Sequence, residues 1–329
     1  MLQTVDRLAH SPPRRSALAR HGLDTRRLHL LVAVAAVAAI STIAACGGSG
    51  DSTDIVRTST TAGAPFVDDL GDTVAFGPAV RIVSLNPVTT EFLFAAGAGA
   101  RVVGRTHWDH YPPEADAVPD MGNGIGPNVE VIVGARPDLV IVYATTGNQR
   151  AVAALHAAGI RTLAIRTDLV ADLSRFAAAY AHVTGDSAAL IVADTVLASI
   201  EAVRALPRPA VPTRVFWRVG EPPLYTAGAG GFMGELIEIA GASNIFGDID
   251  APAPQVSIEE VVRRSPDLVI VGPLGANQVR ASASWQSVPA VSAGRIVVFD
   301  TALVARPGVR LGEAARHIRE LIYGQRMRQ

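Results

Sequence analysis

Residues 107–110 (His-Trp-Asp-His) hold the densest group of side chains that could do chemistry in this 329-residue chain. Two imidazoles and a carboxylate are ligands that zinc or iron accepts, so the segment could begin a metal site. The other histidines of the mature chain fall in predicted helices: His156, His182 and His317. We therefore expect no closed metal site. An exposed loop is the simpler interpretation, and an axial contact from His107 or His110 to a bound metal complex stays open.

Two glycine-containing segments match catalytic motifs only in part. Residues 185–187 (Gly-Asp-Ser) lack the Gly-x-Ser-x-Gly frame of a nucleophile elbow and precede a predicted helix, where Asp or Ser acts as a cap. Residues 228–231 (Gly-Ala-Gly-Gly) could cradle an anion before another predicted helix. They match neither the dinucleotide-binding pattern nor the P-loop, so we interpret them as a flexible loop at the edge of a cleft. The sequence therefore favours binding over catalysis.

Composition limits the class of protein further. Apolar residues make up 49% and charged residues 18% of the chain, which is enough apolar surface for a sizeable core. The formal net charge of −1 gives no basic surface for nucleic acid. The single cysteine, Cys46, excludes an internal disulfide and a multi-cysteine zinc site.

The N-terminal region, residues 1–45, predicts an export signal. Five arginines between positions 14 and 27 precede an apolar run over 28–45, the two parts of a secretory signal. The run ends in Ile-Ala-Ala before Cys46, which resembles a bacterial lipobox whose cysteine becomes lipidated. A plain signal peptide and an uncleaved anchor are the alternatives. Residues 46–65, rich in Gly, Ser and Thr, predict a flexible tether, so we expect an extracytoplasmic protein anchored to a membrane.

The chain contains an internal repeat. Residues 129–142 and 258–271 align with a constant offset of 129, and both run from an apolar helical pattern through Pro-Asp to Leu-Val-Ile-Val. Proline ends a helix, and a continuous β-branched run is typical of a parallel strand buried on both faces. The period is too long for a solenoid, so the repeat predicts two similar Rossmann-like α/β lobes.

Alternating strands and helices in both lobes predict parallel sheets with right-handed crossovers. The predicted strands are 81–85, 101–104, 139–142, 162–165, 214–219, 268–271 and 295–299, and the matching first helices are 87–96 and 233–240. Residues 187–206 contain neither Gly nor Pro and have apolar residues at helical spacing: Leu190, Ala193, Leu197, Ile200 and Val203. Such a helix would span roughly 30 Å. We expect it to join an N-terminal lobe (66–186) to a C-terminal lobe (207–329) as one stiff connector.

Between about residues 66 and 322, short segments in a fixed order match those of a known protein family. They are Arg81–Pro87, Thr90-Glu91, Tyr111–Ala115, Asn128–Glu130, Pro137–Ile141, Pro222-Pro223, Gly241–Phe246 and Gln255–Ser257. In these segments the chain resembles the helical-backbone class of substrate-binding proteins of bacterial ABC importers, which serve cobalamin, ferric siderophores and haem. It is most similar to the cobalamin-binding members. The resemblance implies a ligand cleft between the lobes and no intrinsic cofactor, with cobalamin or a ferric chelate as the transported ligand.

The resemblance implies several ligand-binding residues. It places Trp108, Tyr143 and Tyr225 in loops that face the cleft, where flat rings suit a corrin or porphyrin. Arg306 matches a cleft arginine that could hold an amide, a propionate or a phosphate, and His107 is a further candidate. Ordinary packing is the alternative for each ring. The chain departs from the cobalamin-binding members by lacking their tryptophan near residues 122–126 and the tryptophan and aspartate near the final arginine.

The resemblance also implies a partner. Members of the class dock on a permease dimer through one glutamate on each lobe, and Glu130 and Glu259, which the repeat superimposes, match these positions. Such charges steer encounter and fix register, although a carboxylate at a helix N-terminus can also simply complement the macrodipole. We expect a monomer that delivers its ligand to the permease. The alternatives are a haem or siderophore carrier, a scaffold without ligand, or a metal-dependent hydrolase built on His107, Asp109 and His110.

Overall fold

The computed structural model describes residues 65–300, 303–304 and 306–324. The predicted signal peptide (1–45), Cys46 and nearly all of the predicted tether lie outside the described residues. In the part of the chain that is described, no helix has the length and apolar character needed to cross a membrane.

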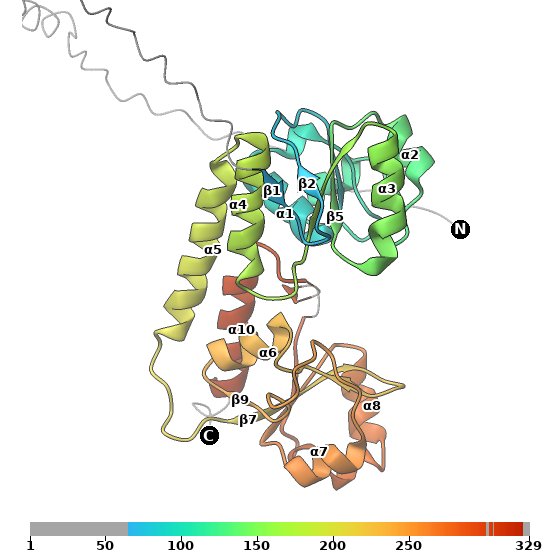
Figure 1. Ribbon diagram of the computed structural model, residues 1–329. Helices are drawn as coiled ribbons and strands as arrows, with labels where there is room; N and C mark the ends of the chain where they lie inside the picture. Colours follow the sequence, from blue (N-terminus) through green and yellow to red (C-terminus); the bar gives the residue numbers. More distant parts are fainter. Residues whose placement is uncertain (1–64, 301–302, 305, 325–329) are drawn as a thin grey trace, which may run out of the picture. The chain divides into compact units, whose positions relative to one another are not determined.

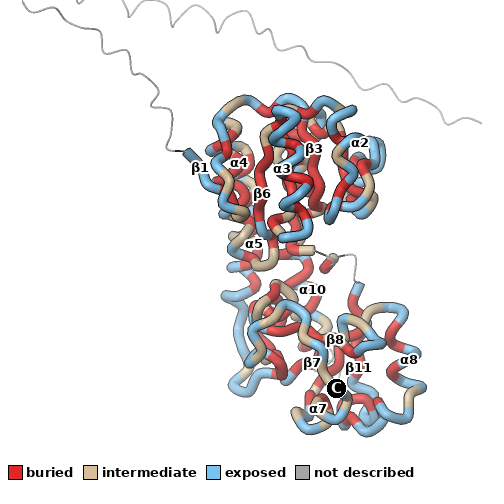
Figure 2. The backbone as a smooth tube through the Cα atoms, turned by 45° about the vertical axis from the view of Figure 1, so that its right-hand side comes forward, coloured by how far each residue is buried: buried red, intermediate tan, exposed pale blue. Residues whose placement is uncertain are grey.

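A four-stranded parallel sheet forms the centre of the N-terminal lobe (Figure 1). Its order is β4 (Val102–Gly104), β3 (Ile82–Leu85), β5 (Leu139–Tyr143) and β6 (Arg161–Ile165). The helices of this lobe are α1 (Pro87–Ala95), α2 (Val129–Gly134), α3 (Gln149–Ala157) and α4 (Asp172–Thr184), with single turns at Gly99–Arg101, Pro113–Ala117 and Thr146–Asn148. The strands are buried, as Figure 2 shows, because helices cover the sheet. A short antiparallel hairpin precedes them: β1 (Phe66–Val67) and β2 (Thr73–Val74).

The C-terminal lobe repeats this arrangement with one addition. The parallel strands run in the order β9 (Ser243–Asn244), β7 (Arg214–Gly220), β10 (Leu268–Val271) and β11 (Ile296–Val298). The added strand β8 (Tyr225–Thr226) pairs antiparallel with the end of β7. Its helices are α6 (Phe232–Ile239), α7 (Ile258–Arg264), α8 (Gly275–Ala281), α9 (Pro289–Ser292) and α10 (Leu311–Tyr323), with a turn at Trp285–Ser287. The matching strand orders confirm the prediction of two similar α/β lobes.

Helix α5 (Ala188–Arg204) occupies the place in the chain predicted for the connecting helix. It packs against α1 and α4 of the N-terminal lobe and against α6 and α10 of the C-terminal lobe. Its cap comes from Asp186, whose Oδ1 accepts from the backbone N–H of Ala188 at 3.1 Å, and the side chain of Ser187 makes no cap bond. The predicted apolar face is partly wrong, since Leu190 is 40% exposed while Ala189 and Val196 are buried. One apolar cluster runs through α5 into both sheets, so the lobes share a core.

The repeated Pro-Asp sequence has the same structural role in both lobes. Helices α2 and α7 are each followed by a residue with positive φ, Arg136 at +50° and Ser265 at +45°. The aspartate after each proline then accepts backbone hydrogen bonds at the start of the neighbouring strand. Asp138 Oδ2 accepts from Val80 and Arg81 at 2.9 and 3.1 Å, and Asp267 Oδ2 accepts from Arg214 at 2.9 Å. The repeat therefore encodes the join between a helix and two strands.

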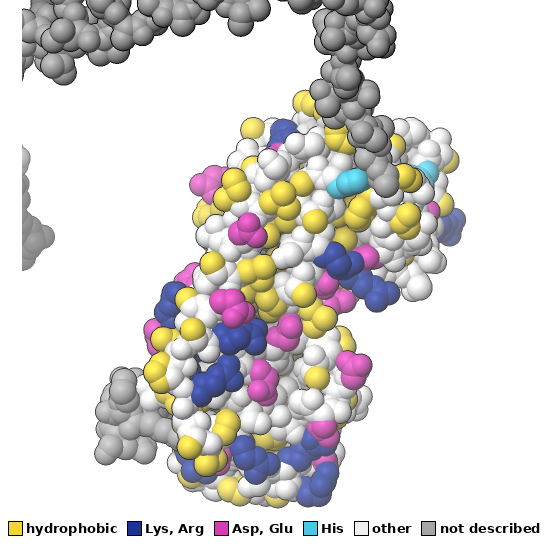
Figure 3. Space-filling view, turned by 60° about the vertical axis from the view of Figure 1, so that its left-hand side comes forward, with side chains coloured by type: hydrophobic (Ala, Val, Ile, Leu, Met, Phe, Trp, Pro, Cys, Tyr) yellow, Lys and Arg dark blue, Asp and Glu magenta, His cyan; other side chains and the backbone are white. Residues whose placement is uncertain are grey.

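Charged side chains of opposite sign lie next to one another on the molecular face shown in Figure 3. Exposed apolar side chains are scattered between them. This face presents no continuous basic patch of the kind that binds nucleic acid, in line with the composition.

Candidate functional site

A cavity of about 500 Å³ is lined by residues of both lobes. The structure brings three of the predicted ligand-binding residues together in it: Trp108, Tyr143 and Arg306. From the N-terminal lobe it adds Asn86, Pro87, Val88, Thr167 and Asp168, and from the C-terminal lobe Gly231, Phe232, Met233, Pro252, Ala253 and Pro307. Several of these residues lie next to the ends of β3, β5 and β6, the edge of a parallel sheet where α/β proteins place ligands.

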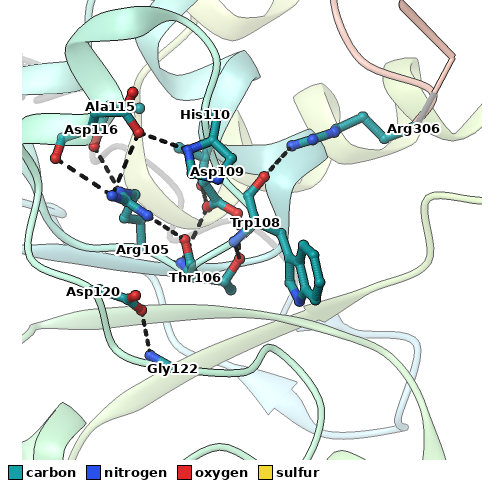
Figure 4. Close-up of polar contacts among 11 residues, drawn as sticks. Arg105, Thr106, Trp108, Asp109, His110, Ala115, Asp116, Asp120, Gly122 and Arg306 are labelled. Atoms are coloured by element: carbon teal, nitrogen blue, oxygen red, sulfur yellow. Dashed lines mark hydrogen bonds and ion pairs between the residues drawn. The ribbon is translucent and has the colours of Figure 1, made fainter. Parts of the chain in front are cut away.

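Trp108 is held by a buried polar network behind it. The fully buried Asp109 accepts a hydrogen bond from Thr90 Oγ1 at 2.5 Å and another from Thr106 Oγ1. The backbone N–H of Trp108 donates to Thr106 Oγ1 at 3.2 Å, while the indole ring points away from the network (Figure 4). Burial raises the pKa of Asp109, and the threonine hydrogen bonds only partly oppose this. The network thus leaves Trp108 59% exposed on a fixed backbone.

The metal-site interpretation of residues 107–110 is wrong for the described structure. Asp109 faces the threonines, and His110 Nδ1 lies 2.8 Å from Asp116 Oδ1 on the surface. His107 packs against the ring of Trp108, with 4.5 Å between ring centroids, and does not line the cavity. No group of three His, Cys, Asp or Glu side chains within the described residues is arranged to hold a metal ion. The three side chains of the hydrolase alternative therefore point to different neighbours in this structure.

Tyr143 is fixed by Asp168, a residue whose backbone also contacts the other lobe. Its hydroxyl donates to Asp168 Oδ1 at 2.7 Å. Burial, with the hydrogen bond and charge of Asp168, raises the pKa of Tyr143 to about 12, so the phenol keeps its proton at neutral pH. The backbone carbonyl of Asp168 accepts from the N–H of Phe232 at 2.9 Å, at the start of α6. The loop after β6 thus joins the ring to the C-terminal lobe.

Arg306 reaches across from the C-terminal lobe to the N-terminal lobe. Its Nη1 donates to the carbonyl oxygen of Trp108 at 3.0 Å, and its Nε lies 3.8 Å from Oε1 of Glu91. Glu91 is 1% exposed and also accepts from Arg310 Nη2 at 3.4 Å. A Cβ on Gly308 would lie 2.1 Å from Glu91 Oε2, so only glycine fits between the two arginines. Burial raises the pKa of Glu91 despite both guanidinium groups.

Tyr225 does not join this group. It lies half-buried in β8, opposite Gly220 of β7, and forms a β-bridge with Gln255. It does not line the cavity described above. Its place after two prolines predicted a cleft loop, but the hairpin with β7 turns it into a strand residue.

The glycine-rich segment 228–231 lies at the edge of the cavity, as predicted, through Gly231. Its glycines allow close packing on a neighbouring loop, since a Cβ on Gly228 would lie 2.1 Å from the carbonyl oxygen of Ala251. The N–H of Phe232 that follows is already bonded to Asp168. The segment therefore packs closely on the neighbouring loop, and its Phe232 N–H serves a contact between the lobes.

A second cavity, of about 550 Å³, was not predicted from the sequence. It belongs to the C-terminal lobe and shares Met233 with the first cavity. Its lining comes from the ends of β7, β10 and β11 and the start of α8: Trp217, Arg218, Val219, Gly272, Pro273, Leu274, Gly275, Asp300 and Val304. The sequence indicates this cavity only by position, because its lining residues end or follow predicted parallel strands.

Glu130 and Glu259 occupy equivalent places in the first turns of α2 and α7, and both are exposed. Asn128 Oδ1 caps α2 by accepting from Glu130 N–H at 3.0 Å, and Ser257 Oγ caps α7 by accepting from Glu260 N–H at 3.2 Å. Hydrogen bonds from the backbone and from Ser257 lower the pKa of Glu259. Both carboxylates are therefore accessible to a partner, and both also complement a helix dipole.

Comparisons with known proteins agree with this architecture. A family model described as periplasmic binding protein matches residues 82–303. The vitamin B12-binding protein of Salmonella typhimurium is 32% identical over 210 residues, covering 63% of this chain and 77% of that protein. The periplasmic vitamin B12 binding protein BtuF of Vibrio cholerae has a TM-score of 0.66 at 25% identity, covering 76% of this chain and 99% of that one. The periplasmic heme-binding protein RhuT from Roseiflexus sp. RS-1 has a TM-score of 0.66 at 27% identity, covering 74% and 98%. The family model spans both lobes, and this chain belongs to the periplasmic binding protein family.

Proposed function

We propose that this protein captures a corrinoid such as cobalamin in its cleft and delivers it to the permease of an ABC importer. The first cavity carries the proposal, because Trp108, Tyr143 and Arg306 line one space together with residues of the other lobe. The second cavity shares the lining residue Met233 with the first, which supports a ligand that extends over both. The relatives named as vitamin B12-binding proteins support a corrinoid, and family membership implies an extracytoplasmic location.

The donor set of the cleft favours a corrinoid over haem. Haem iron relies on an axial ligand from the protein, typically His, Cys, Met or Tyr, whereas cobalamin carries its own lower ligand and upper ligand. Among the described lining residues of the two cavities there is no His or Cys. Tyr143 keeps its proton and donates it to Asp168, which leaves Met233 as the remaining soft donor. A ferric siderophore also has filled coordination and is the second candidate ligand.

Delivery requires contacts outside the cleft. Glu130 and Glu259, one on each lobe, are exposed, which supports their pairing with arginines of a permease dimer. Lipidation of Cys46 would keep the protein on the membrane that holds the permease. In this proposal the protein acts as a monomer without catalysis, and its function consists of binding and a small closure of the cleft.

The test is a titration of the purified full-length protein in detergent with cyanocobalamin, haemin and a panel of ferric siderophores. Trp108 lines the first cavity and Trp217 the second, whereas the 2% exposed Trp285 lines neither, so the tryptophan fluorescence reports on both cavities. We expect calorimetry to show saturable binding of cyanocobalamin. Trp108→Ala should lower the affinity about tenfold or more through loss of the ring contact.

The matched control is Trp108→Phe, which keeps an aromatic face. It should retain most of the affinity while removing the part of the fluorescence change that comes from Trp108. Binding of haemin alone would replace the corrinoid by haem, and binding of none of the compounds would contradict the proposed function.

A further inference from the structure

Each cavity of the cleft is lined by one arginine and one aspartate. The first holds Arg306 and Asp168, and the second holds Arg218 and Asp300. The rest of both linings is uncharged. A ligand in this cleft therefore meets a donor and an acceptor in each cavity, with no net positive charge.

Arg218 is held firmly in the second cavity. Its Nε donates to Glu221 Oε2 and its Nη2 to Gln278 Oε1, both at 3.0 Å, and its side chain is 9% exposed. A Cβ on Gly275 would lie 2.3 Å from Arg218 Nη1, so glycine leaves the space that the guanidinium fills. Glu221, itself fixed by Trp285 Nε1 at 3.1 Å, already balances the charge of Arg218. The cavity thus offers N–H donors without an uncompensated positive charge.

The acceptors face the same spaces. Asp168 belongs to the first cavity and is held through Tyr143, and Asp300 follows β11 in the second cavity. A carboxylate arm of a ligand would meet these aspartates as a like charge, which raises the cost of burying it. A primary carboxamide has a carbonyl that accepts and an NH₂ that donates, so it pairs with arginine and aspartate together.

We propose that the second cavity is a subsite for carboxamide arms of the ligand, in which Arg218 and Asp300 select amides against carboxylates. Apolar side chains beside this pair, among them Met233 and the 90% exposed Leu274, would pack on the methylene groups that carry such an arm. The inference rests on the proposed function and sharpens it, because corrinoids carry primary carboxamides at their rim whereas haem carries carboxylates.

The experiment compares cyanocobalamin with its monocarboxylate derivatives, in which one peripheral propionamide has been hydrolysed to the acid. Calorimetry at neutral pH gives the affinity ratio of amide to acid for each derivative. In the unsubstituted protein we expect at least one derivative to bind about tenfold more weakly than cyanocobalamin, the effect of one mismatched charged hydrogen bond. Asp300→Asn should bring that ratio to within about threefold, because an amide side chain accepts and donates.

Asp248→Asn is the matched control, since Asp248 pairs with Arg264 in the same lobe outside both cavities. It should leave the ratio unchanged. Equal affinities for amide and acid in the unsubstituted protein, or a ratio that Asp300→Asn does not alter, would overturn the subsite while cyanocobalamin binding upholds the proposed function. Failure of cyanocobalamin itself to bind would overturn both.

Discussion

The two lobes share a strand order and a helix–Pro-Asp–strand repeat, yet they use their carboxylates differently. Beside the cleft, the N-terminal lobe buries Glu91 and Asp109, and burial raises the pKa of each. On its surface, the C-terminal lobe pairs Glu260 with Arg263 and Arg264, and Asp248 with Arg264, and these contacts lower the pKa of both acids. The repeat therefore determines the backbone arrangement of both lobes, whereas the surroundings of their carboxylates differ from one lobe to the other.

The surroundings of the two exposed glutamates differ in the same way. Near Glu130, the exposed side chains of α2 and the preceding loop include three apolar ones: Ile125, Val131 and Val133. Next to Glu259, Glu260 forms ion pairs with Arg263 and Arg264. If both glutamates meet a symmetric permease, the two halves of that contact have different chemistry.

The largest expected difference between the lobes lies in the repeat itself. Asp138→Ala removes an acceptor of two backbone hydrogen bonds, and Asp267→Ala removes an acceptor of one. We expect the free energy of unfolding to fall by about 2 kcal/mol for Asp138→Ala and by about 1 kcal/mol for Asp267→Ala. Each hydrogen bond to a carboxylate contributes about 1 kcal/mol at a partly exposed site. Urea unfolding followed by circular dichroism measures both.

The Asp→Asn variants are the controls, since asparagine keeps one acceptor oxygen. They should lose less than half as much as the alanine variants. Equal losses for Asp138→Ala and Asp267→Ala would show that the number of hydrogen bonds does not govern the stability of this join.

Local patterns in the sequence predict the frame well. The runs at 139–142 and 268–271 are buried strands as predicted, because continuous β-branched residues specify a covered parallel strand without reference to the rest of the chain. The first helix of each lobe also begins and ends within one residue of its prediction.

The site was less predictable because it depends on distant contacts. Trp108, Tyr143 and Arg306 line one cavity, and Asp168, which the sequence does not predict there, is bonded to Tyr143, 25 residues away. The sequence does not predict Arg218 as a site residue, because its side chain is held by Gln278, 60 residues along the chain. The sequence predicts Tyr225 in a loop, because a strand of two residues such as β8 is too short to show the alternating pattern that would indicate its pairing with β7.

The next comparison concerns the two carboxylates that cross between the lobes. Glu91 of the N-terminal lobe faces Arg306, and Glu235 of the C-terminal lobe accepts from the N–H of Val170 at 2.7 Å. Glu91→Gln should lower the affinity for cyanocobalamin about tenfold by releasing Arg306. When Arg306→Gln is already present, Glu91→Gln should lower the affinity further by less than about twofold. Glu235→Gln, the matched control, should cost about twofold in both backgrounds. Similar losses for Glu91→Gln in the two backgrounds would contradict a role through Arg306.

A ligand-free measurement sharpens this comparison. The folded-state pKa of Glu91 is raised above the ordinary value of 4.5, so the folded state holds this proton more tightly than the unfolded chain does. The resulting stability is fully present below the unfolded pKa and is lost as the pH rises through the folded pKa. The unfolding free energy of the wild type minus that of Glu91→Gln should therefore fall from pH 4 towards pH 7. A difference that rises over this range would contradict the effect of burial at Glu91.

The smallest expected effects concern docking and depend on the proposed delivery to a permease. Glu259→Gln should slow association with permease-containing vesicles about fivefold at low ionic strength, and high salt should remove most of this difference. Glu130→Gln should have a smaller and less salt-dependent effect, because Val131 and Val133 add exposed apolar area beside it. Val131→Ser should then slow docking at all salt concentrations, since loss of apolar contact is not screened. Identical salt dependence for the two glutamate variants would mean that the permease does not distinguish the two copies of the repeat.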